Sequence, residues 1–374
     1  MSDNRRNLRV SHTGEPITSR SNQKERGTMK AVYFSEHGGP EVLQYGDMPE
    51  PSVGPNQVKI RVHAAALNRL DVYSRAGVRG TRRKFDDGPH IPGADAAGEI
   101  VEVGSEVSAH KVGARVVINP RQTCQQCEAC IGRHEEYCRR SGMVGSSTTG
   151  SYAEFLSVPA ASAITLPSSV SYEEAASLPT VYLPSWSILV RRAALQPWET
   201  ALILSASSGV GTAAIQVAKN VIGSKVITTT STAEKAQKAT ELGADEVINY
   251  TDEDVADRIK EITGGRGVDV VLDHVGADFW PAASRSLAMG GRYGICGVTS
   301  GYRAELQMGA MFTRYQTVFG VFMGRNSDLQ QIVEMTGRGV IRGIIHETFP
   351  LEDAAKAHEV MEGLSFFGKL VLTM

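Results

Sequence analysis

Short apolar runs separated by Gly and Pro fill the chain from residue 30 to residue 165. Examples are VKIRVHAAAL at 58–67, GEIVEVG at 98–104 and ARVVIN at 114–119. Runs rich in β-branched residues and bounded by turn residues predict strands, and their close spacing predicts an all-β unit of the barrel or sandwich type. We therefore expect no βαβ repeats in this part of the chain.

From residue 200 onwards, apolar strand-like runs alternate with helical stretches. The strand-like runs are ALILSA, KVITTT, EVINY, VDVVLDHV and GRYGICG. This alternation predicts a doubly wound parallel sheet with helices on both faces. After residue 330 come a helical stretch, a β-like HETFPL, the helix EDAAKAHEVME and a last strand GKLVLTM. These pieces are too few for a third domain, so we expect them to complete the first one.

The predicted division places residues 29–170 and 335–374 in the β unit and residues 171–334 in the α/β domain. Residues 1–28 are polar and rich in Arg and Ser, and they predict a disordered tail before the strand that opens at Met29. A start codon assigned too early is one alternative. A mitochondrial transit peptide is another, which the acidic residues of this segment disfavour.

Composition excludes two classes of function. Lys plus Arg number 39 and Asp plus Glu number 41, a formal net charge of −2, so no broad field draws the chain to nucleic acid or an anionic membrane. No apolar run approaches the ~20 residues that a membrane span needs. We expect a cytoplasmic protein whose partners are small molecules, with no nucleic acid and no membrane among them.

A glycine-rich turn follows the first strand of the α/β part and opens a helix. Glycines in such a turn let the backbone approach a pyrophosphate, and the N-terminus of the helix attracts the anion. A tight structural turn is the alternative, but four further strands follow, as a nucleotide-binding domain requires. The predicted contacts are Ser207, Ser208, Gly209, Val210 and Gly211.

The end of the next strand indicates which dinucleotide is bound. An NAD enzyme usually carries Asp or Glu there to bind the ribose 2′-hydroxyl, whereas this strand ends in hydroxyl residues that include Thr230 and Ser231. With Lys235 they favour a 2′-phosphate, and hence NADPH over NADH; the alternative for Lys235 is a solvated helix surface. Tyr250 is expected at the adenosine end, or as a half-buried strand aromatic.

Four of the five cysteines lie within fifteen residues, as Cys124-x2-Cys127-x2-Cys130-x7-Cys138. Four thiolates at this spacing can surround one Zn²⁺ with no open position, which is typical of a structural site. Iron–sulfur motifs differ in spacing, and a reducing compartment disfavours disulfides. We expect a zinc lobe over residues 120–142.

A β unit, a four-cysteine lobe with gaps of two, two and seven, and a dinucleotide domain together resemble the zinc-containing alcohol dehydrogenases of the medium-chain dehydrogenase/reductase superfamily. The resemblance runs from Lys30 to the C-terminus. It implies an α/β fold with a GroES-like, β-barrel-type catalytic domain and a Rossmann domain, a cleft between them, and a homodimer or homotetramer. Further cofactor contacts are expected at Val275, Cys296, Gly297 and Lys369, where Cys296 is a small buried filler rather than a nucleophile.

The catalytic zinc ligands of that family do not recur. Asn68 stands in place of the first Cys, Ala94 in place of the His and Thr180 in place of the second Cys. Asp71 and Asp95 remain, but carboxylates replace soft thiolates poorly. His63 and His90 lie nearby in the sequence and could rebuild a metal site, although hydrogen-bonded structural roles are the ordinary interpretation.

Asn68-x-x-Asp71 and Thr180 resemble instead the quinone oxidoreductase and enoyl reductase branch. The chain is therefore expected to use NADPH to reduce an activated C=C or a quinone, with one structural zinc and no catalytic zinc. The Asn68 amide and the Thr180 hydroxyl are expected near the nicotinamide and the acceptor carbonyl. Tyr73 or solvent would supply the proton; core packing is the alternative for Tyr73.

Two other functions stay open at this point. One is an alcohol or aldehyde dehydrogenase of the zinc-containing family, and the other is a noncatalytic NADPH-binding sensor. The basic segment Arg79–Lys84 could hold an anionic substrate tail such as that of a coenzyme A thioester. A solvated surface loop is its ordinary alternative.

Overall fold

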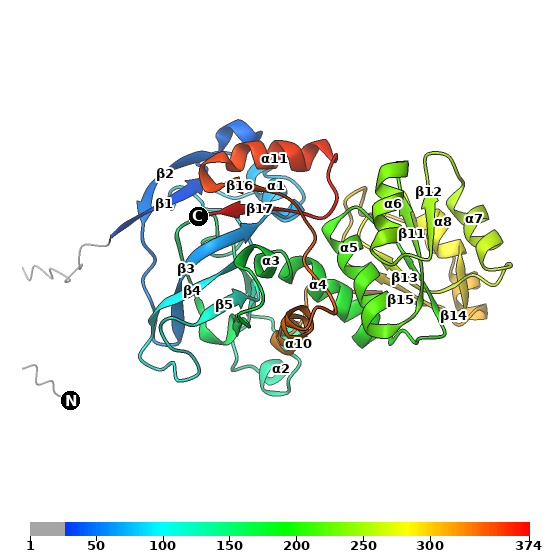
Figure 1. Cartoon of the computed structure of the whole chain (residues 1–374), viewed down its shortest axis with the longest axis horizontal. Helices are drawn as coiled ribbons and strands as arrows, with labels where there is room; N and C mark the ends of the chain where they lie inside the picture. Colours follow the sequence, from blue (N-terminus) through cyan, green and yellow to red (C-terminus); the bar gives the residue numbers. More distant parts are fainter. Residues whose placement is uncertain (1–26) are drawn as a thin grey trace, which may run out of the picture.

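Two sheets organise residues 27–374, the part of the chain that this computed structural model describes (Figure 1). The long strand β3 (Gln57–Ala66) is central to the first sheet and alternates buried with more exposed side chains. It pairs with β4 along one edge, and β8 and β17 share its other edge. The first sheet contains β3, β4 (Asp95–Val103), β5 (Arg115–Ile118), β8 (Phe155–Pro159), β9 (Ala163–Thr165), β16 (Ile345–Pro350) and β17 (Lys369–Thr373).

The ends of the described chain meet this first sheet in different ways. The hairpin of β1 (Thr28–Tyr33) and β2 (Gln44–Pro49) lies beside it, and β17 brings the C-terminus back to pair with β3. The predicted tail, residues 1–28, lies outside the described residues except for its last two, and Thr28 already belongs to β1.

The second sheet is parallel, with strand order β12-β11-β10-β13-β14-β15. This is the doubly wound order of dinucleotide-binding domains, in which ligands bind at the carboxyl ends of the strands where the order reverses. The five predicted runs are its first five strands, and the short TVFG adds a sixth. The strands are β10 (Thr200–Ile203), β11 (Lys225–Thr230), β12 (Glu246–Asn249), β13 (Val268–Asp273), β14 (Leu287–Ile295) and β15 (Thr317–Gly320).

Helices cover both faces of this sheet, as the alternation of strands and helices predicts. Ala201 and Ile203 of β10 pack with α5 and α6 on one face, and Leu202 and Leu204 pack with α7 and α8 on the other. Neighbouring strand residues point to opposite faces, so a strand buried on both sides reads as a continuous apolar run. The helices are α5 (Gly209–Gln216), α6 (Ala233–Glu241), α7 (Val255–Ile262) and α8 (Trp280–Arg285).

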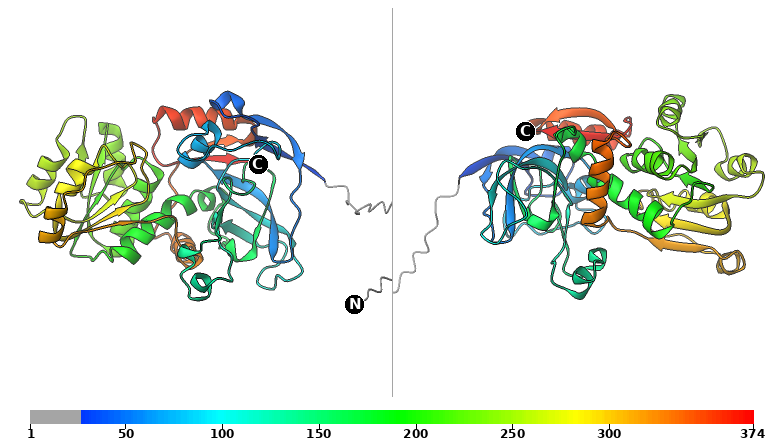
Figure 2. Two further views of the ribbon diagram at one scale, coloured as in Figure 1. Left: turned by 180° about the vertical axis from the view of Figure 1, so that it is seen from behind. Right: turned by 60° about the horizontal axis from the view of Figure 1, so that its bottom comes forward.

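The two lobes share one apolar core. Ala64 and Ala66 of β3 belong to the same cluster of buried residues as Ala201 and Ile203 of β10. Helix α4 (Pro179–Trp186) packs on α5, and α10 (Asn326–Gly337) packs on α4 and β9, between the lobes in both views (Figures 1 and 2). Continuous packing of this kind fixes the lobes relative to each other.

The remaining helices and strands belong to neither of the two large sheets. Helix α3, which the sequence places in the second domain, packs against β3 and β4 of the first sheet. No helix among the described residues has the length and apolar content to cross a membrane. These remaining elements are α1 (Arg69–Ala76), α2 (Glu128–Ile131), α3 (Tyr172–Ala176), α9 (Met308–Thr313), α11 (Ala354–Gly363), β6 (Arg121–Gln122) and β7 (Gly142–Met143).

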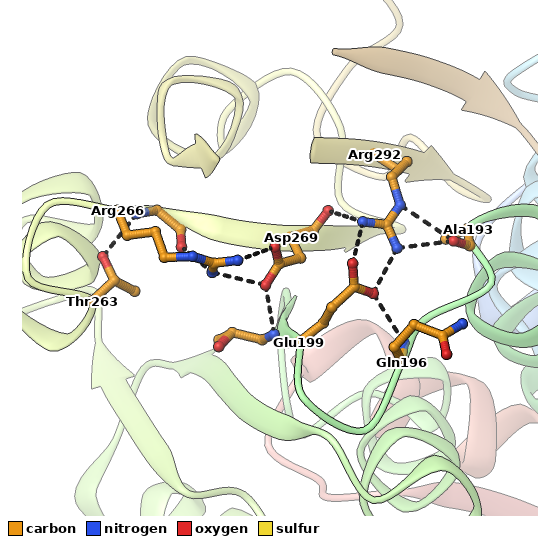
Figure 3. A network of polar contacts seen from close by, with 9 residues as sticks. Ala193, Gln196, Glu199, Thr263, Arg266, Asp269 and Arg292 are labelled. Atoms are coloured by element: carbon orange, nitrogen blue, oxygen red, sulfur yellow. Dashed lines mark hydrogen bonds and ion pairs between the residues drawn. The ribbon is translucent and has the colours of Figure 1, made fainter. Parts of the chain in front are cut away.

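A polar network ties the strands of the second sheet together at the end away from the predicted cofactor site (Figure 3). Arg292 of β14 donates to both carboxylate oxygens of Glu199, at 2.8 and 2.7 Å. Asp269 of β13 accepts two bonds from Arg266 and one from the backbone N–H of Thr200. Paired Arg–carboxylate bonds fix geometry as well as adding energy.

Replacing Glu199 by Ala is expected to lower the free energy of unfolding by about 1–3 kcal/mol, because the Arg292 guanidinium loses its partner. The measurement is urea unfolding followed by circular dichroism. Glu234→Ala is the control, since Glu234 forms an exposed ion pair with Lys238 and its loss is expected to change little. Equal effects of the two substitutions would contradict this account.

Candidate active site

The carboxylate of Asp95 is the centre of a buried polar cluster. Asp95 opens β4 and is fully buried. It accepts hydrogen bonds from the Asn68 side chain at 3.0 Å, from the Thr180 backbone at 3.2 Å and from the Thr180 hydroxyl at 2.7 Å. Residues from the end of β3, the start of β4 and the start of α4 therefore meet at one carboxylate. The structure brings together Asn68 and Thr180, which lie more than one hundred residues apart in the sequence.

The ammonium group of Lys369 completes the cluster. Its Nζ donates to the Leu67 carbonyl and to Asn68 Oδ1, both at 2.6 Å, and lies 3.6 Å from Asp95 Oδ2. The side chain of Lys369 is 5% exposed, and its stem passes directly over Gly209, where an added Cβ would lie 2.8 Å from Lys369 Cδ. Lys369, predicted as a cofactor contact, thus links the glycine turn to the Asn68 cluster.

Asp71 is attached to this cluster through the backbone. It lies in the first turn of α1 and accepts a hydrogen bond from the Asn68 N–H at 2.8 Å, a capping arrangement that fixes where the helix begins. Burial raises the pKa of Asp71 to about 7, against the effect of the Asn68 hydrogen bond. Asp71 is therefore a carboxyl group that can change its charge near neutral pH.

Asp95 and Lys369 stabilise each other's charged forms. Burial raises the pKa of Asp95 and lowers the pKa of Lys369, while each group opposes the shift of the other. Asp95 also accepts from Asn68 and Thr180, and hydrogen bonds of this kind favour the carboxylate. We assign the pair as a carboxylate and an ammonium ion.

The side chains at positions 68, 94 and 180 do not fit a catalytic zinc. Asn68, Ala94 and Thr180 offer an amide, a methyl group and a hydroxyl, and the amide and hydroxyl already bond to Asp95. The Lys369 ammonium is 2.6 Å from the Asn68 oxygen and would repel a second cation.

The two nearby histidines do not rebuild a metal site among the described residues. The His63 ring stacks on Tyr172 at 4.5 Å. The His90 Nε2 bonds to the Gly145 carbonyl at 2.9 Å, and burial lowers the pKa of His90 to about 4. Across residues 27–374, the cysteine lobe is the one group of three or more His, Cys, Asp or Glu side chains with a metal-binding arrangement.

Tyr73, in α1, lies outside the Asp95 cluster. Its ring is 5.0 Å from the Arg79 guanidinium, which also lies 5.2 Å from the Tyr302 ring. Arg79 donates to the carbonyls of Val298 and Thr299 at 2.8 and 2.6 Å and so bridges the two lobes. In the basic segment 79–84, Arg83 also bonds within the protein, since it donates to the Ser146 carbonyl.

The glycine turn has the geometry of a phosphate-binding loop. Ser208 caps α5, accepting from the Gly211 N–H at 2.8 Å, and the unpaired N–H groups of a helix N-terminus attract anions. A Cβ on Gly211 would lie 2.1 Å from the Ser205 carbonyl, so the turn admits only glycine there. Ser207, Gly209 and Val210 occupy the same turn.

The carboxyl end of β11 carries hydroxyl groups and a lysine. Thr230 is buried and its Oγ1 has no hydrogen-bond partner, and Ser231 follows it. Lys235, in the first turn of α6, donates to the Leu364 carbonyl at 2.8 Å. Tyr250 is 40% exposed beyond β12 and meets the Phe279 ring edge-on at 5.1 Å.

The remaining predicted cofactor contacts follow β13 and β14. The N–H of Val275 donates to Asp273, and that of Cys296 donates to the Asp273 carbonyl. A Cβ on Gly297 would lie 2.7 Å from the His274 carbonyl. Burial raises the pKa of the Cys296 thiol, so Cys296 stays protonated and packs as a small filler.

The four lobe cysteines converge. Their sulfur atoms all lie within 4.8 Å of one another, and three of the separations are 3.5, 3.5 and 3.9 Å. Tetrahedral Zn–S bonds of about 2.3 Å give sulfur–sulfur separations of about 3.8 Å. The four residues Cys124, Cys127, Cys130 and Cys138 therefore fit one zinc ion with no open position.

The thiols of this lobe are unlike one another without a cation. Backbone N–H groups of Gln126 and Cys127 lower the pKa of Cys124 to about 6. Burial and the neighbouring sulfurs, that of Cys127 foremost, raise the pKa of Cys130 to about 12. A divalent cation would stabilise all four as thiolates.

Known protein families match both lobes of the fold. Two family models match, “Alcohol dehydrogenase GroES-like domain” on residues 54–168 and “Zinc-binding dehydrogenase” on residues 209–338. Quinone oxidoreductase 1 of Escherichia coli is 31% identical over 91% of this chain and 98% of its own. The NAD-dependent alcohol dehydrogenase of Saccharolobus solfataricus is 34% identical over 92% and 99%. A solved structure of an NAD-dependent alcohol dehydrogenase, 38% identical, has a TM-score of 0.87 and covers 92% of this chain and 100% of that one.

The chain belongs to the medium-chain dehydrogenase/reductase superfamily. The predicted family and the predicted GroES-like and Rossmann-type fold are confirmed, and the chain is an oxidoreductase. Its relatives include both quinone oxidoreductases and alcohol dehydrogenases. The substrate class must therefore be inferred from the site itself.

Three residues beside Asp71 were not predicted from the sequence. Tyr152, His358 and Arg75 are buried in contact with Asp71 or with one another. They come from three distant segments and belong to no recognisable motif. The structure alone shows that these three side chains are buried together.

For the cysteine lobe we expect one zinc per chain by elemental analysis of the purified protein. Cys127→Ser should remove most of this zinc and lower the thermal midpoint, because metal binding contributes directly to the folding of such a lobe. Cys296→Ser is the control and should leave the zinc content unchanged. Two zinc ions per chain, or full zinc content in Cys127→Ser, would contradict this assignment.

Proposed function

We propose that the chain is an NADPH-dependent reductase of activated C=C bonds or quinones that works without a catalytic metal. One observation carries the proposal. The Lys369 ammonium, bonded to Asn68 and paired with Asp95, lies beside residues that stand, by the family resemblance, in place of the catalytic zinc ligands. Alcohol oxidation needs a Lewis acid to stabilise an alkoxide, whereas a conjugated acceptor spreads its developing charge onto its own carbonyl oxygen.

The buried cluster supplies a rigid platform for this chemistry. Both Asn68 Nδ2 contacts are internal, to Asp95 and to the Ala66 carbonyl, and the Thr180 hydroxyl donates to Asp95. In this arrangement Thr180 Oγ1 can still accept a hydrogen bond, while Asn68 must exchange one of its bonds in order to donate to an acceptor carbonyl. The Lys369–Asp95 pair keeps its contacts and is the preorganised part of the cluster, whereas a hydrogen bond from Asn68 to the acceptor requires this exchange.

Bound along the glycine turn, NADPH would supply a hydride, which carries two electrons and one hydrogen to the acceptor and leaves NADP⁺. One further proton, from Tyr73 or from solvent, would complete the reduction. The Lys369 ammonium adds a fixed positive charge in a dry site, where charges act more strongly than in water. Asn68, Asp71 and Thr180 hold the reacting groups in place.

The end of β11 supports NADPH over NADH. The buried Thr230 hydroxyl has no partner, and Ser231 and Lys235 follow it along the chain. The nearest acid along the chain, Glu234, pairs with Lys238 at 2.7 Å. A 2′-phosphate would accept from the Ser231 hydroxyl and draw Lys235 from the Leu364 carbonyl.

A surface of the second lobe supports the proposed homodimer or homotetramer. Large apolar side chains are exposed around β15, the edge strand of its sheet. Exposed patches of this kind beside an unpaired strand edge are typical of subunit contacts. They are Met289, Tyr302, Leu306, Met308, Phe312 and Tyr315.

Alcohol dehydrogenase activity is the second candidate, because a relative and a solved neighbour carry that name. A panel of enones, quinones, enoyl thioesters and aldehydes, assayed with NADPH and NADH, separates the candidates. We expect turnover of an enone, enoyl thioester or quinone that persists after dialysis against a chelator that leaves the structural zinc in place. Turnover of alcohols alone, lost with a second metal, would support the second candidate; tight NADPH binding with no turnover would support a sensor.

Ser231→Asp is expected to lower kcat/KM for NADPH about tenfold or more, because a carboxylate repels the 2′-phosphate and instead accepts from a 2′-hydroxyl. The ratio of NADH to NADPH activity should rise accordingly. Ser231→Ala is the control and should weaken NADPH binding without improving NADH. An unchanged preference in Ser231→Asp would place the 2′-phosphate elsewhere.

A further inference from the structure

A buried chain of hydrogen bonds leads away from Asp71 to the surface of the first lobe. Asp71 Oδ2 accepts from the Tyr152 hydroxyl at 3.3 Å, and this hydroxyl lies 3.4 Å from His358 Nε2. His358 Nδ1 lies 3.2 Å from Arg75 Nη1, and Arg75 Nη2 donates to Glu362 at 2.6 Å. The side chains of Asp71, Tyr152, His358 and Arg75 are all at least 99% buried, while that of Glu362 is 37% exposed.

The chain of bonds has a fixed direction. Arg75 carries donors only and does not lose its proton, so His358 Nδ1 must accept. A neutral imidazole then carries its proton on Nε2 and donates it to the Tyr152 oxygen. The Tyr152 hydrogen is left to point at Asp71. Burial, together with Arg75, lowers the pKa of His358 to about 3, which keeps the ring in this neutral form.

The same bonds favour the ionised form of Asp71. A hydrogen bond donated to a carboxylate stabilises its charge, and Asp71 receives two, from Tyr152 and from the Asn68 N–H. The charged groups that face Asp71 are Asp95 from β4, which opposes its ionisation, and Lys369 from β17, which favours it. Burial and Asp95 both favour the protonated form of Asp71. Without the Tyr152 hydroxyl, one hydrogen bond fewer would oppose them.

We propose that Tyr152 and His358 are positioning residues that favour the ionised form of Asp71 and thereby set the charge of the buried cluster around Lys369. An ionised Asp71 keeps a second negative charge near the Lys369 ammonium and holds the Asn68 N–H in its capping bond. When Asp71 is protonated, both effects weaken. This inference deepens the proposed reductase function and rests on it for its effect on turnover.

The chain of bonds is not a proton wire. Passing the Nε2 proton of His358 inward would require Arg75 to return a proton to Nδ1, and a guanidinium does not do so. The arrangement therefore determines a charge state and an orientation rather than carrying protons from the surface. Arg75, held also by the Gly38 carbonyl at 3.2 Å, is its fixed outer end.

The test compares Tyr152→Phe with Tyr182→Phe in the full-length, zinc-loaded protein. Tyr182 is as deeply buried, and Tyr182→Phe removes a hydroxyl that donates one hydrogen bond, to the Arg342 carbonyl at 2.8 Å, but does not contact Asp71. The first readout is the thermal midpoint as a function of pH, which needs no turnover. The second is the pH profile of kcat/KM with NADPH and a benzoquinone.

The sign of the expected shift follows from linkage. Because burial raises the pKa of Asp71 in the folded state to about 7, its protonation stabilises the fold at low pH, and this contribution is lost as the pH rises through the folded-state value. Tyr152→Phe should move that loss, and the acidic limb of kcat/KM, to higher pH. Tyr182→Phe should lower the midpoint at all pH values without moving either profile, and Asp71→Asn should abolish the transition.

The two readouts separate the failure of this inference from failure of the proposed function. Coincident pH profiles for Tyr152→Phe and Tyr182→Phe in the melting experiment would overturn the inference. A moved melting profile with an unmoved acidic limb would overturn the link to turnover. If no acceptor is reduced at all, the proposed function fails, while the melting profiles still decide the role of Tyr152. If Tyr152→Phe does not fold, His358→Gln replaces it, with a shift expected in the same direction.

Discussion

The buried ion pair between Lys369 and Asp95 is the interaction on which the site depends. It joins the last strand of the chain to the first sheet, and the stem of Lys369 also covers Gly209 at the cofactor turn. Buried charges are costly unless they are paired and hydrogen-bonded. Here Asn68, Thr180 and the Leu67 carbonyl complete the hydrogen bonds of the pair, so the polar residues of the cleft are held in one arrangement.

This arrangement explains how a chain with a zinc lobe can differ from the zinc enzymes it resembles. The four-cysteine lobe has its own ligands, none of which belongs to the Asp95 cluster. In the cleft, an amide, a methyl group and a hydroxyl leave room for an ammonium ion. The Lys369 ammonium then bonds to Asn68, one of the residues that stand, by the family resemblance, in place of the catalytic zinc ligands.

Much of the fold could be predicted because local sequence patterns indicate it. Continuous apolar runs such as VDVVLDHV mark strands buried on both faces, and the glycines at 209 and 211 mark a turn with no room for side chains. The cysteine spacing could be interpreted in the same way. The sixth strand, β15, is only four residues long and lacks such a pattern. The placement of α3 against the first sheet depends on tertiary packing, which local sequence does not encode.

The polar cluster was predictable only in part, for the same reason. Asn68 and Thr180 were identified as candidates from their motifs, but their common partner Asp95 and the inward path of Lys369 depend on how the sheets and helices meet. The most direct test of the central claim is anomalous diffraction at the zinc edge from crystals grown with NADP⁺. We expect one peak, at the four cysteines, and the Lys369 ammonium between Asn68 and Asp95. A second peak in the cleft beside Asn68 and Thr180 would contradict the account.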